Sequence, residues 1–244
     1  MLKIIVPLGG SSELFTNAGH FYPKPLIEIM GKPMVQLVIE NASISVPHQF
    51  IFIIKEEDAV RFHIDNTLKL LSPGCEIIKL KKATKGGLCS VLMGIDRIAD
   101  DDSILVINGD QVIDEDFDSI YKYWKDNNAD AGIVTFKSVH PRWSYARIED
   151  GSVVQTAEKN PISQHAIAGY YYFDKAATFF ECAYQSILND VQFEGSYYIS
   201  PVMNEYVLRN KTVLNYKIET EQYHSFYSPH LLQEFETKAN LIHS

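Results

Sequence analysis

The sequence predicts an α/β fold: a mostly parallel, doubly wound, Rossmann-like mixed sheet flanked by helices, with a small β-rich lobe. Two observations lead to this prediction. Short apolar runs alternate with amphipathic segments over the first 137 residues, as expected for parallel strands joined by helical crossovers. From residue 138 onward, short strand-like runs surround Asp150-Gly151, a strong hairpin turn signal.

The elements of the first half follow in order from their apolar spacing. Buried strands are predicted at 2–8, 50–54, 76–80, 103–108 and 131–136, where apolar residues are nearly continuous. Helices are predicted at 34–41, 56–71, 88–99 and 117–124. Ser72-Pro73-Gly74 ends the second helix, and Gly86-Gly87 precedes the third. This alternation gives a parallel sheet with helices on both faces.

The second half is expected to complete the same sheet. Strands are predicted at 145–149, 153–158, 167–173 and 213–218, and helices at 174–188, 199–209 and 229–241. Asp174 is the expected N-cap of its helix. The last helix should carry Leu231, Leu232, Phe235 and Leu241 on one side. Because no linker rich in Pro, Gly or Ser is present, we expect one domain, 1–244, with lobes 1–137 and 138–244.

Composition narrows the class of partner. The 244 residues are 46% hydrophobic and carry a net charge of −9, which disfavours nonspecific binding to nucleic acid or anionic membranes. No apolar run approaches membrane-spanning length. Cys75, Cys89 and Cys182 lack metal-ligand spacing and form an odd number, which favours free thiols in a reducing cytoplasm. The eight histidines show no zinc spacing.

The first 33 residues hold the clearest candidate site. The first strand runs into Gly9-Gly10-Ser11-Ser12, small residues that allow a phosphate to approach backbone N–H groups. Lys24 then lies between Pro23 and Pro25, which restrict the backbone around it to an extended form. The pattern suits a phosphate cradle with a fixed cation. The simpler alternative, a strand, a turn and a surface lysine, stays open on these residues alone.

Asp110 is the candidate metal ligand. It follows the apolar strand 103–108 through Asn108-Gly109, and open α/β sheets bind ligands at such strand ends. Mg²⁺ prefers carboxylate oxygen. The alternative is a turn, since Asn-Gly-Asp also has good turn chemistry. The nearby Asp114-Glu115-Asp116 precedes a helix and is interpreted as a helix-start feature.

Two later segments could contact a ligand. Lys85-Gly86-Gly87 allows close backbone approach before a helix, although an ordinary loop fits as well. Glu158-Lys159-Asn160-Pro161 ends a strand with adjacent acid and base, which could bind hydroxyls and a phosphate. A solvated strand end is the alternative there.

Two motifs carry a resemblance to a known family. Pro23-Lys24-Pro25-Leu26 and Gly31-Lys32-Pro33-Met34, at this spacing, resemble the sugar-nucleotide pyrophosphorylases, including the glucose-1-phosphate nucleotidyltransferases. The resemblance extends over nearly the whole chain. It implies transfer of a nucleotidyl group from an NTP to a sugar 1-phosphate, or to a similar phosphomonoester such as choline phosphate, with Mg²⁺ as cofactor. Pyrophosphate would leave, and the nucleotide sugar would serve surface polysaccharide synthesis.

The resemblance also implies roles for individual residues. Lys24 would stabilise the α-phosphate, and Asp110 would hold Mg²⁺. The nucleotide would contact Leu8, Gly9, Gly10, Ser11, Lys82, Lys85, Gly86, Gly87, Asn108 and Gly109. The acceptor would contact Tyr145, Ala146, Glu158, Lys159, Gly169, Tyr170, Glu194 and Tyr198.

Three positions depart from the family pattern. Leu14 stands where the family has an arginine, Lys82 where it often has a glutamine, and Ser225 where it has a second metal-binding aspartate. The arginine and the aspartate both handle the triphosphate and its metal. Two alternatives to the enzyme therefore remain, a nucleotide- or sugar-phosphate-binding protein of the same fold and a glycosyltransferase using an activated sugar. A homo-oligomer is also possible.

Overall fold

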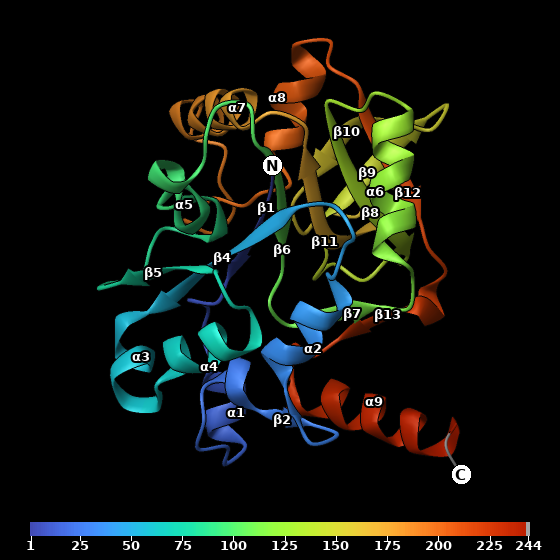
Figure 1. Ribbon diagram of the computed structural model, residues 1–244. Coiled ribbons are helices and arrows are strands. Elements are labelled where there is room, and N and C mark those ends of the chain that lie inside the picture. Colours follow the sequence, from blue (N-terminus) through green and yellow to red (C-terminus); the bar gives the residue numbers. More distant parts are fainter. Residues whose placement is uncertain (243–244) are drawn as a thin grey trace.

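The computed structural model describes residues 1–242, with side chains to residue 239 (Figure 1). Its centre is a nine-stranded mixed sheet with the order β5-β4-β1-β6-β11-β8-β12-β10-β9. Four neighbouring strands of the first half run parallel: β5 (Glu76–Leu80), β4 (His48–Lys55), β1 (Leu2–Pro7) and β6 (Ser103–Ile107). The predicted α/β fold with a mixed sheet is confirmed.

The strands of the second half interleave with those of the first. β11 (His165–Phe173) lies between β6 and β8 (Ala131–Lys137) and is antiparallel to both. β12 (Val213–Lys217) pairs with β8 in parallel, and β9 (Tyr145–Glu149) forms a hairpin with β10 (Ser152–Ala157). Because β9 also pairs with the start of β11, and β10 with β12, these five strands form a closed ring of pairings.

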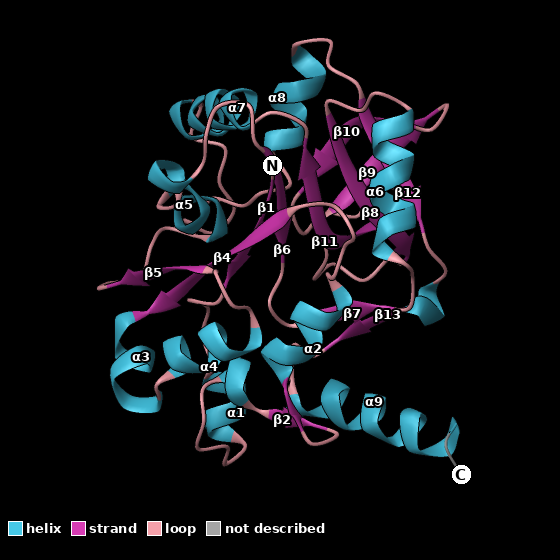
Figure 2. Ribbon diagram, in the orientation of Figure 1, coloured by secondary structure: helices cyan, strands magenta, loops and turns pink. Residues whose placement is uncertain are grey.

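Helices cover both faces of the sheet (Figure 2). In β1, Ile4 packs into one core with α2, α4 and α6, whereas Ile5 packs into the other with α5, α7 and α8. This is the alternation expected of a strand buried on both faces. The helices are α1 (Glu13–Asn17), α2 (Met34–Asn41), α3 (Glu56–Phe62), α4 (Ile64–Leu71), α5 (Gly87–Leu92), α6 (Phe117–Asp126), α7 (Ala176–Leu188), α8 (Val202–Leu208) and α9 (Pro229–Ile242).

Short elements complete the chain at the edge where β1 and β6 end. Two small ribbons pair β2 (Glu28–Ile29) with β3 (Lys32–Pro33), and β7 (Gln111–Ile113) with β13 (Tyr223–Ser225). The 3₁₀ turns η1 (Lys24–Leu26) and η3 (Thr220–Gln222) lie in this region too, whereas η2 (Ile95–Arg97) precedes the start of β6. A third apolar cluster joins α9 to this region through Leu232 and Phe226.

Two predicted helices are wrong in their extent. The segment 56–71 is two helices, because His63 adopts a left-handed conformation (φ 53°) between α3 and α4. The break lets Ile64 and Leu68 of α4 reach the core. The segment 88–99 ends as an α-helix at Leu92 and continues through a turn into η2. Gly94 lies in that turn, and glycine is a poor helix former.

The predicted helix start at Asp116 and the predicted hairpin turn at Asp150-Gly151 are present, whereas the predicted cap at Asp174 is not. Asp116 caps α6 by accepting from the backbone N–H groups of Asp118 and Ser119, so the helix-start prediction is confirmed. The Asp150-Gly151 hairpin turn is also confirmed, with positive φ at both residues. The Asp174 cap is wrong, because that carboxylate accepts from Lys125 and Tyr172 and α7 begins at Ala176.

Of the last two predicted helices, α8 is shorter than predicted and α9 begins at Pro229 as predicted. The helix predicted at 199–209 begins only at Val202, after Pro201. On α9, Leu232 is buried and Phe235 packs against the third apolar cluster. Leu241 lies outside the residues whose side chains the structure describes. Within residues 1–242, no helix combines the length and the apolar character needed to cross a membrane.

Candidate functional site

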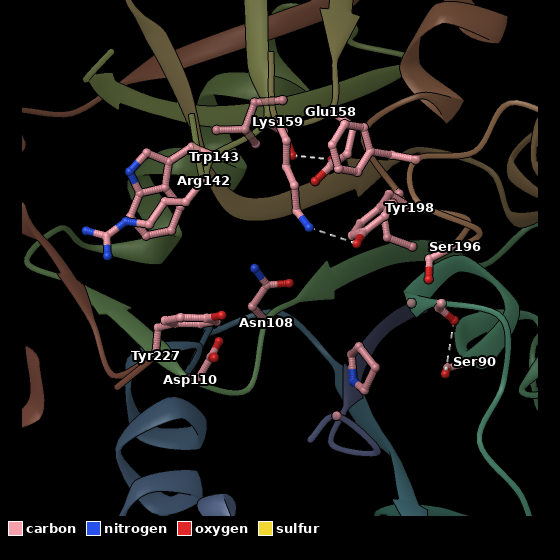
Figure 3. Close-up of a pocket in the computed structure, with 18 of the residues that line it drawn as sticks. Ser90, Asn108, Asp110, Arg142, Trp143, Glu158, Lys159, Ser196, Tyr198 and Tyr227 are labelled. Carbon is pink, nitrogen blue, oxygen red and sulfur yellow. Dashed lines mark hydrogen bonds between the residues drawn. The ribbon is translucent and has the colours of Figure 1, made fainter. Parts of the chain in front are cut away.

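A cavity of about 930 Å³ opens at the carboxyl ends of β1 and β6 (Figure 3). Neighbouring parallel strands lie on opposite sides of β1, with β4 on one side and β6 on the other, and open α/β sheets bind ligands at such a switch point. The cavity is lined by the glycine loop, by residues of the segment 83–90 and by the end of β6. Residues of the second half complete the wall, from the segments 141–144, 158–159, 167–171, 193–199 and 223–227. A smaller cavity of about 130 Å³ adjoins it at Asp110.

Lys24 and Asp110 lie together where the two cavities meet. Lys24 Nζ donates to Asp110 Oδ2 at 2.7 Å, and both side chains are about one-fifth exposed (18% and 21%). The backbone holds each residue in place. The N–H of Lys24 donates to Ser12 Oγ, and the Phe226 N–H donates to the carbonyl of Asp110. Among the described residues no donor reaches Asp110 Oδ1, so one carboxylate oxygen remains available to a ligand.

The glycine loop and the strand end surround this pair. Gly9, Gly10 and Asn108 line the larger cavity, and Leu8, Gly10 and Gly109 line the smaller one with Lys24. Ser11 lines neither cavity, because its Oγ accepts from the N–H of Glu13 at the start of α1. The exposed Leu14 on α1 also lies outside both cavity walls.

We name residues 83–90 the base loop, because they include Lys85, Gly86 and Gly87, which the resemblance assigns to the nucleotide. Gly86 (φ 107°) and Gly87 line the cavity, and a Cβ on Gly86 would lie 2.3 Å from the carbonyl oxygen of Tyr197. Thr84 and Ser90 line it too, with their hydroxyls 2.6 Å apart. The side chains of Lys82 and Lys85 are exposed and lie outside its wall.

A second loop, residues 193–199, lies against the base loop and also lines the cavity, and we name it the acceptor loop. Its Tyr197 N–H donates to the carbonyl of Lys85 at 2.8 Å, and the N–H of Leu88 donates to the carbonyl of Tyr197 at 3.1 Å. Glu194 and Tyr198 line the cavity. The two backbone hydrogen bonds therefore join segments that lie more than a hundred residues apart in the chain.

Glu158 and Lys159 directly follow β10 at the upper wall of the cavity in Figure 3. Ser144 Oγ and Ser200 Oγ both donate to Glu158 Oε2. Burial raises the pKa of Glu158, against these two hydrogen bonds, which lower it. Lys159 Nζ donates to the Tyr198 hydroxyl at 3.2 Å.

The surroundings of Lys159 keep its ammonium protonated. It lies over the rings of Phe193 and Tyr198 and 3.9 Å from Glu194. Burial alone would lower the pKa of Lys159, but the hydrogen bond to Tyr198 and the nearby acidic groups raise it above the ordinary lysine value. A charged lysine beside a buried carboxyl group could bind a phosphate and a hydroxyl of one ligand.

Four of the predicted acceptor residues do not line the cavity. Tyr145 and Ala146 are buried in β9, where the Tyr145 hydroxyl donates to the carbonyl of His140. Tyr170 is buried on the opposite face of the sheet, and its hydroxyl donates to Asn41 Oδ1. Gly169 lies behind the wall. Its carbonyl accepts from the N–H of Asn108, and a Cβ there would lie 2.3 Å from Asn108 Nδ2.

Residues absent from the sequence analysis also line the cavity. Arg142 and Trp143 come from the loop between β8 and β9, and Tyr223 and Tyr227 flank the end of β13. Gln111 donates to the carbonyl of Ala168 and accepts from Asn108 and Tyr223, which fixes the strand end. No spacing or motif marks these residues, because they come from loops that only the tertiary fold brings together.

The donor set fits Mg²⁺ only with help from a substrate. Within the described part of the chain, no three His, Cys, Asp or Glu side chains cluster as a metal site. Asp110 offers a free carboxylate oxygen, and Ser225 lines the same cavity as a neutral residue. Mg²⁺ commonly binds one or two carboxylates and completes its shell with water and substrate phosphates, so a single carboxylate is sufficient.

Comparisons with known proteins agree with this geometry. A profile of the nucleotidyl transferase family matches residues 4–218. The curated protein "Bifunctional protein GlmU" of Methanocaldococcus jannaschii is 28% identical over 181 residues, and the match spans 71% of this chain and 40% of that protein.

Solved structures extend the likeness in fold. A nucleoside-diphosphate-sugar pyrophosphorylase from Vibrio cholerae RC9 has a TM-score of 0.84 at 24% identity, covering 97% of this chain and 100% of that chain. A UDP-glucose pyrophosphorylase complexed with UDP-glucose has a TM-score of 0.76 at 16% identity, covering 98% of both chains. A UTP-bound UGPase from Acinetobacter baumannii has a TM-score of 0.77 at 15% identity, covering 99% and 94%.

Proposed function

The chain belongs to the nucleotidyl transferase family, and from that premise we propose that it transfers a nucleotidyl group from an NTP to a sugar 1-phosphate or a similar phosphomonoester. One observation supports this proposal above the others. The Lys24–Asp110 pair lies at a cavity that has the base loop on one side and Glu158 with Lys159 on another. The acceptor phosphate attacks the α-phosphorus in line, and pyrophosphate leaves.

Each part of the cavity has a role in this reaction. The small residues Gly9 and Gly10 let the phosphates approach the backbone, while the base contacts Gly86 and Gly87. Lys159 binds the acceptor phosphate, and Glu158 accepts a hydrogen bond from an acceptor hydroxyl. Lys24 leaves Asp110 and stabilises the charge that develops on the α-phosphate. Most of the rate enhancement then comes from positioning and charge neutralisation.

Mg²⁺ is the cofactor that these residues suit. Asp110 would hold it with the substrate phosphates, and the ion would neutralise phosphate charge. The related solved structures support the substrate class, since one holds UDP-glucose and another UTP. We extend the proposal to a nucleotide sugar used in polysaccharide synthesis. The free thiols of Cys75, Cys89 and Cys182 support a cytoplasmic location.

A matrix of NTPs against sugar 1-phosphates and choline phosphate, with Mg²⁺ and read by pyrophosphate release, tests the proposal. We expect one pair to exceed the others clearly, and Asp110→Asn to lose that release while retaining its fold. Release that is equal for all pairs, or unchanged in Asp110→Asn, would overturn it.

A binding protein without turnover is the second candidate, and two observations favour it. Leu14 is exposed away from the cavity, and Ser225 is neutral where a second carboxylate would share the metal. Calorimetry on the same pairs separates the two candidates. Nucleotide binding with no pyrophosphate release would replace the enzyme with the binding protein.

A further inference from the structure

Among the described residues, Arg142 is the cation of the cavity wall that has no acidic partner. Three cationic side chains line the two adjoining cavities, and Lys24 pairs with Asp110 while Lys159 lies 3.9 Å from Glu194. In the part of the chain that the structure describes, no carboxylate lies within 4.0 Å of the Arg142 guanidinium. Its five N–H donors therefore remain available to a ligand.

The loop that carries Arg142 is fixed by contacts around His140. The N–H of Arg142 donates to His140 Nδ1, and the N–H of Trp143 donates to the His140 carbonyl, which also accepts from the Tyr145 hydroxyl. The guanidinium carbon lies 4.5 Å from the centre of the Trp143 ring. Stacking on an indole fixes the plane of a guanidinium and leaves its N–H edge free for a planar anion.

The platform beneath Arg142 is itself packed. The Trp143 ring makes edge contacts with Phe136 at 5.7 Å and with Tyr223 at 5.4 Å between centroids. Phe136 and Tyr223 stack on each other at 4.2 Å. A side chain held in this way loses little rotational freedom when it binds a ligand.

Arg142 lies on the Asp110 side of the cavity, away from the base loop. Figure 3 shows Arg142 and Trp143 on the same side as Tyr227 and Asp110, with Ser90 of the base loop on the far side. If the base contacts Ser90 and the reacting phosphate lies at Asp110, the groups beyond that phosphate extend toward Arg142. The group that arrives there is an oxyanion, either the pyrophosphate end of the NTP or the phosphate of the acceptor.

We propose that Arg142 binds this phosphate oxyanion with its guanidinium edge. The inference rests on the proposed function, because it assumes a phosphate-bearing substrate in the cavity. It gives the phosphates an arginine from the loop between β8 and β9, whereas α1 presents Leu14 outside the cavity wall. A guanidinium can form two parallel hydrogen bonds with phosphate, which neither leucine nor water replaces.

Calorimetry with inorganic pyrophosphate and with glucose 1-phosphate, each with Mg²⁺, tests the proposal on the full chain. Arg142→Gln should weaken binding of one of these probes roughly 10- to 100-fold, and Arg142→Lys should weaken it less. A loss for pyrophosphate identifies the NTP as the source of the oxyanion, and a loss for glucose 1-phosphate identifies the acceptor.

Arg147→Gln is the matched control. Arg147 is exposed on β9, bonds to Gln155 and does not line the cavity, so its loss removes the same charge from the same lobe. The proposal is overturned if Arg142→Gln binds both probes as the wild type does, or if Arg147→Gln loses as much affinity. If the wild type binds neither probe, the proposed function falls as well, so the two failures can be told apart.

Discussion

Lys24 and Asp110 form an ion pair with each other, and under the proposed function each would exchange this partner when substrates bind. The 2.7 Å ion pair places an ammonium group where a divalent cation would approach Asp110. Two cations close to one carboxylate repel each other. The free protein should therefore bind metal weakly, and the metal should enter together with the NTP whose phosphates bind Lys24.

Lys24→Met should accordingly raise the affinity of the nucleotide-free protein for Mn²⁺, by roughly threefold or more. Its turnover should fall by about a hundredfold or more, because a stabiliser of the transition state is lost. Electron paramagnetic resonance of free Mn²⁺ measures the first effect without any reaction. Lys85→Met, which removes an exposed lysine outside the cavity wall, is the control. Equal Mn²⁺ affinity in wild type and Lys24→Met would contradict the exchange of partners.

Glu158 makes stability depend on pH in a defined direction. Burial raises its pKa in the folded chain above the ordinary glutamate value of 4.5. Between the unfolded and folded pKa values the folded state binds more protons, so stability falls as pH rises through that window. The cost of the charged carboxylate is absent below pH 4.5 and complete above the folded pKa.

Glu158→Gln should therefore raise the urea midpoint at about pH 7, and the gain should disappear by about pH 4. The amide oxygen can still accept from Ser144 and Ser200, so the packing is kept. Glu149→Gln, at the exposed end of β9, should show no such pH-dependent gain. A gain for Glu158→Gln that is equal at both pH values would exclude the carboxylate charge as its cause.

At the scale of elements, the bulge in β11 sets the position of the neighbouring strand end. The register of β11 against β8 shifts between Ile167 and Tyr171, and Gly169 within the shift has φ 75°. A Cβ at Gly169 would lie 2.3 Å from Asn108 and 2.6 Å from Gln111. Only glycine allows the bulge to contact the loop that carries Asp110.

Gly169→Ala should be more destabilising than the backbone conformation alone explains. Gly151→Ala is the matched control, since Gly151 has φ 79° and nothing lies within 4 Å of its added Cβ. We expect the control to lower the free energy of unfolding by about 1–2 kcal/mol and Gly169→Ala by roughly twice as much. Urea denaturation measures both variants, and equal losses would mean that Asn108 and Gln111 move aside without cost.

The elements were predictable where local pattern determines them. Apolar runs located β1, β4 and β6 to within two residues, because strands buried on both faces need apolar side chains almost throughout. The strand β5 also lies at its predicted residues, although it is an edge strand and only partly buried. The break at His63 was not predictable, since the residues around it keep a helical apolar spacing. Nor was the insertion of β11 beside β6, because strand order depends on contacts between distant segments.

The site was predictable in its motifs and not in its loops. The flanking prolines mark Lys24, and the apolar strand before Asn108-Gly109 marks Asp110. The structure brings these two residues into contact. Side chains along β9 and β11 alternate between the two faces of the sheet. Which face borders the cavity depends on the neighbouring strands, which the sequence does not reveal. Ser144 therefore lines the cavity while its neighbour Tyr145 is buried.

At the scale of the whole molecule, the two predicted lobes share one sheet, and we infer that they fold as one unit. β6 loses its neighbour β11, and β8 loses both β11 and β12, if the chain ends at residue 137. Trp124 of α6 stacks on Tyr172 of β11 with ring centroids 5.2 Å apart, and it would lose this contact as well. The fragment 1–137 would thus expose apolar surface and unpaired strand edges.

We expect the full chain to melt in a single cooperative transition, and the fragment 1–137 to show none. Circular dichroism against temperature measures both, with dispersion of amide resonances as a second readout. A fragment that melts cooperatively and disperses its resonances would establish the first lobe as an independent domain.

Two backbone hydrogen bonds, from Tyr197 to Lys85 and from Leu88 to Tyr197, join the base loop directly to the acceptor loop. Under the proposed function, we expect a nucleotide that orders Gly86 to order also the backbone next to Tyr198, before any acceptor is present. The first substrate then bears the entropy cost of ordering both loops, and the second binds to loops already in place. Equilibrium linkage makes the advantage mutual: by whatever factor the nucleotide tightens the acceptor, the acceptor tightens the nucleotide by the same factor.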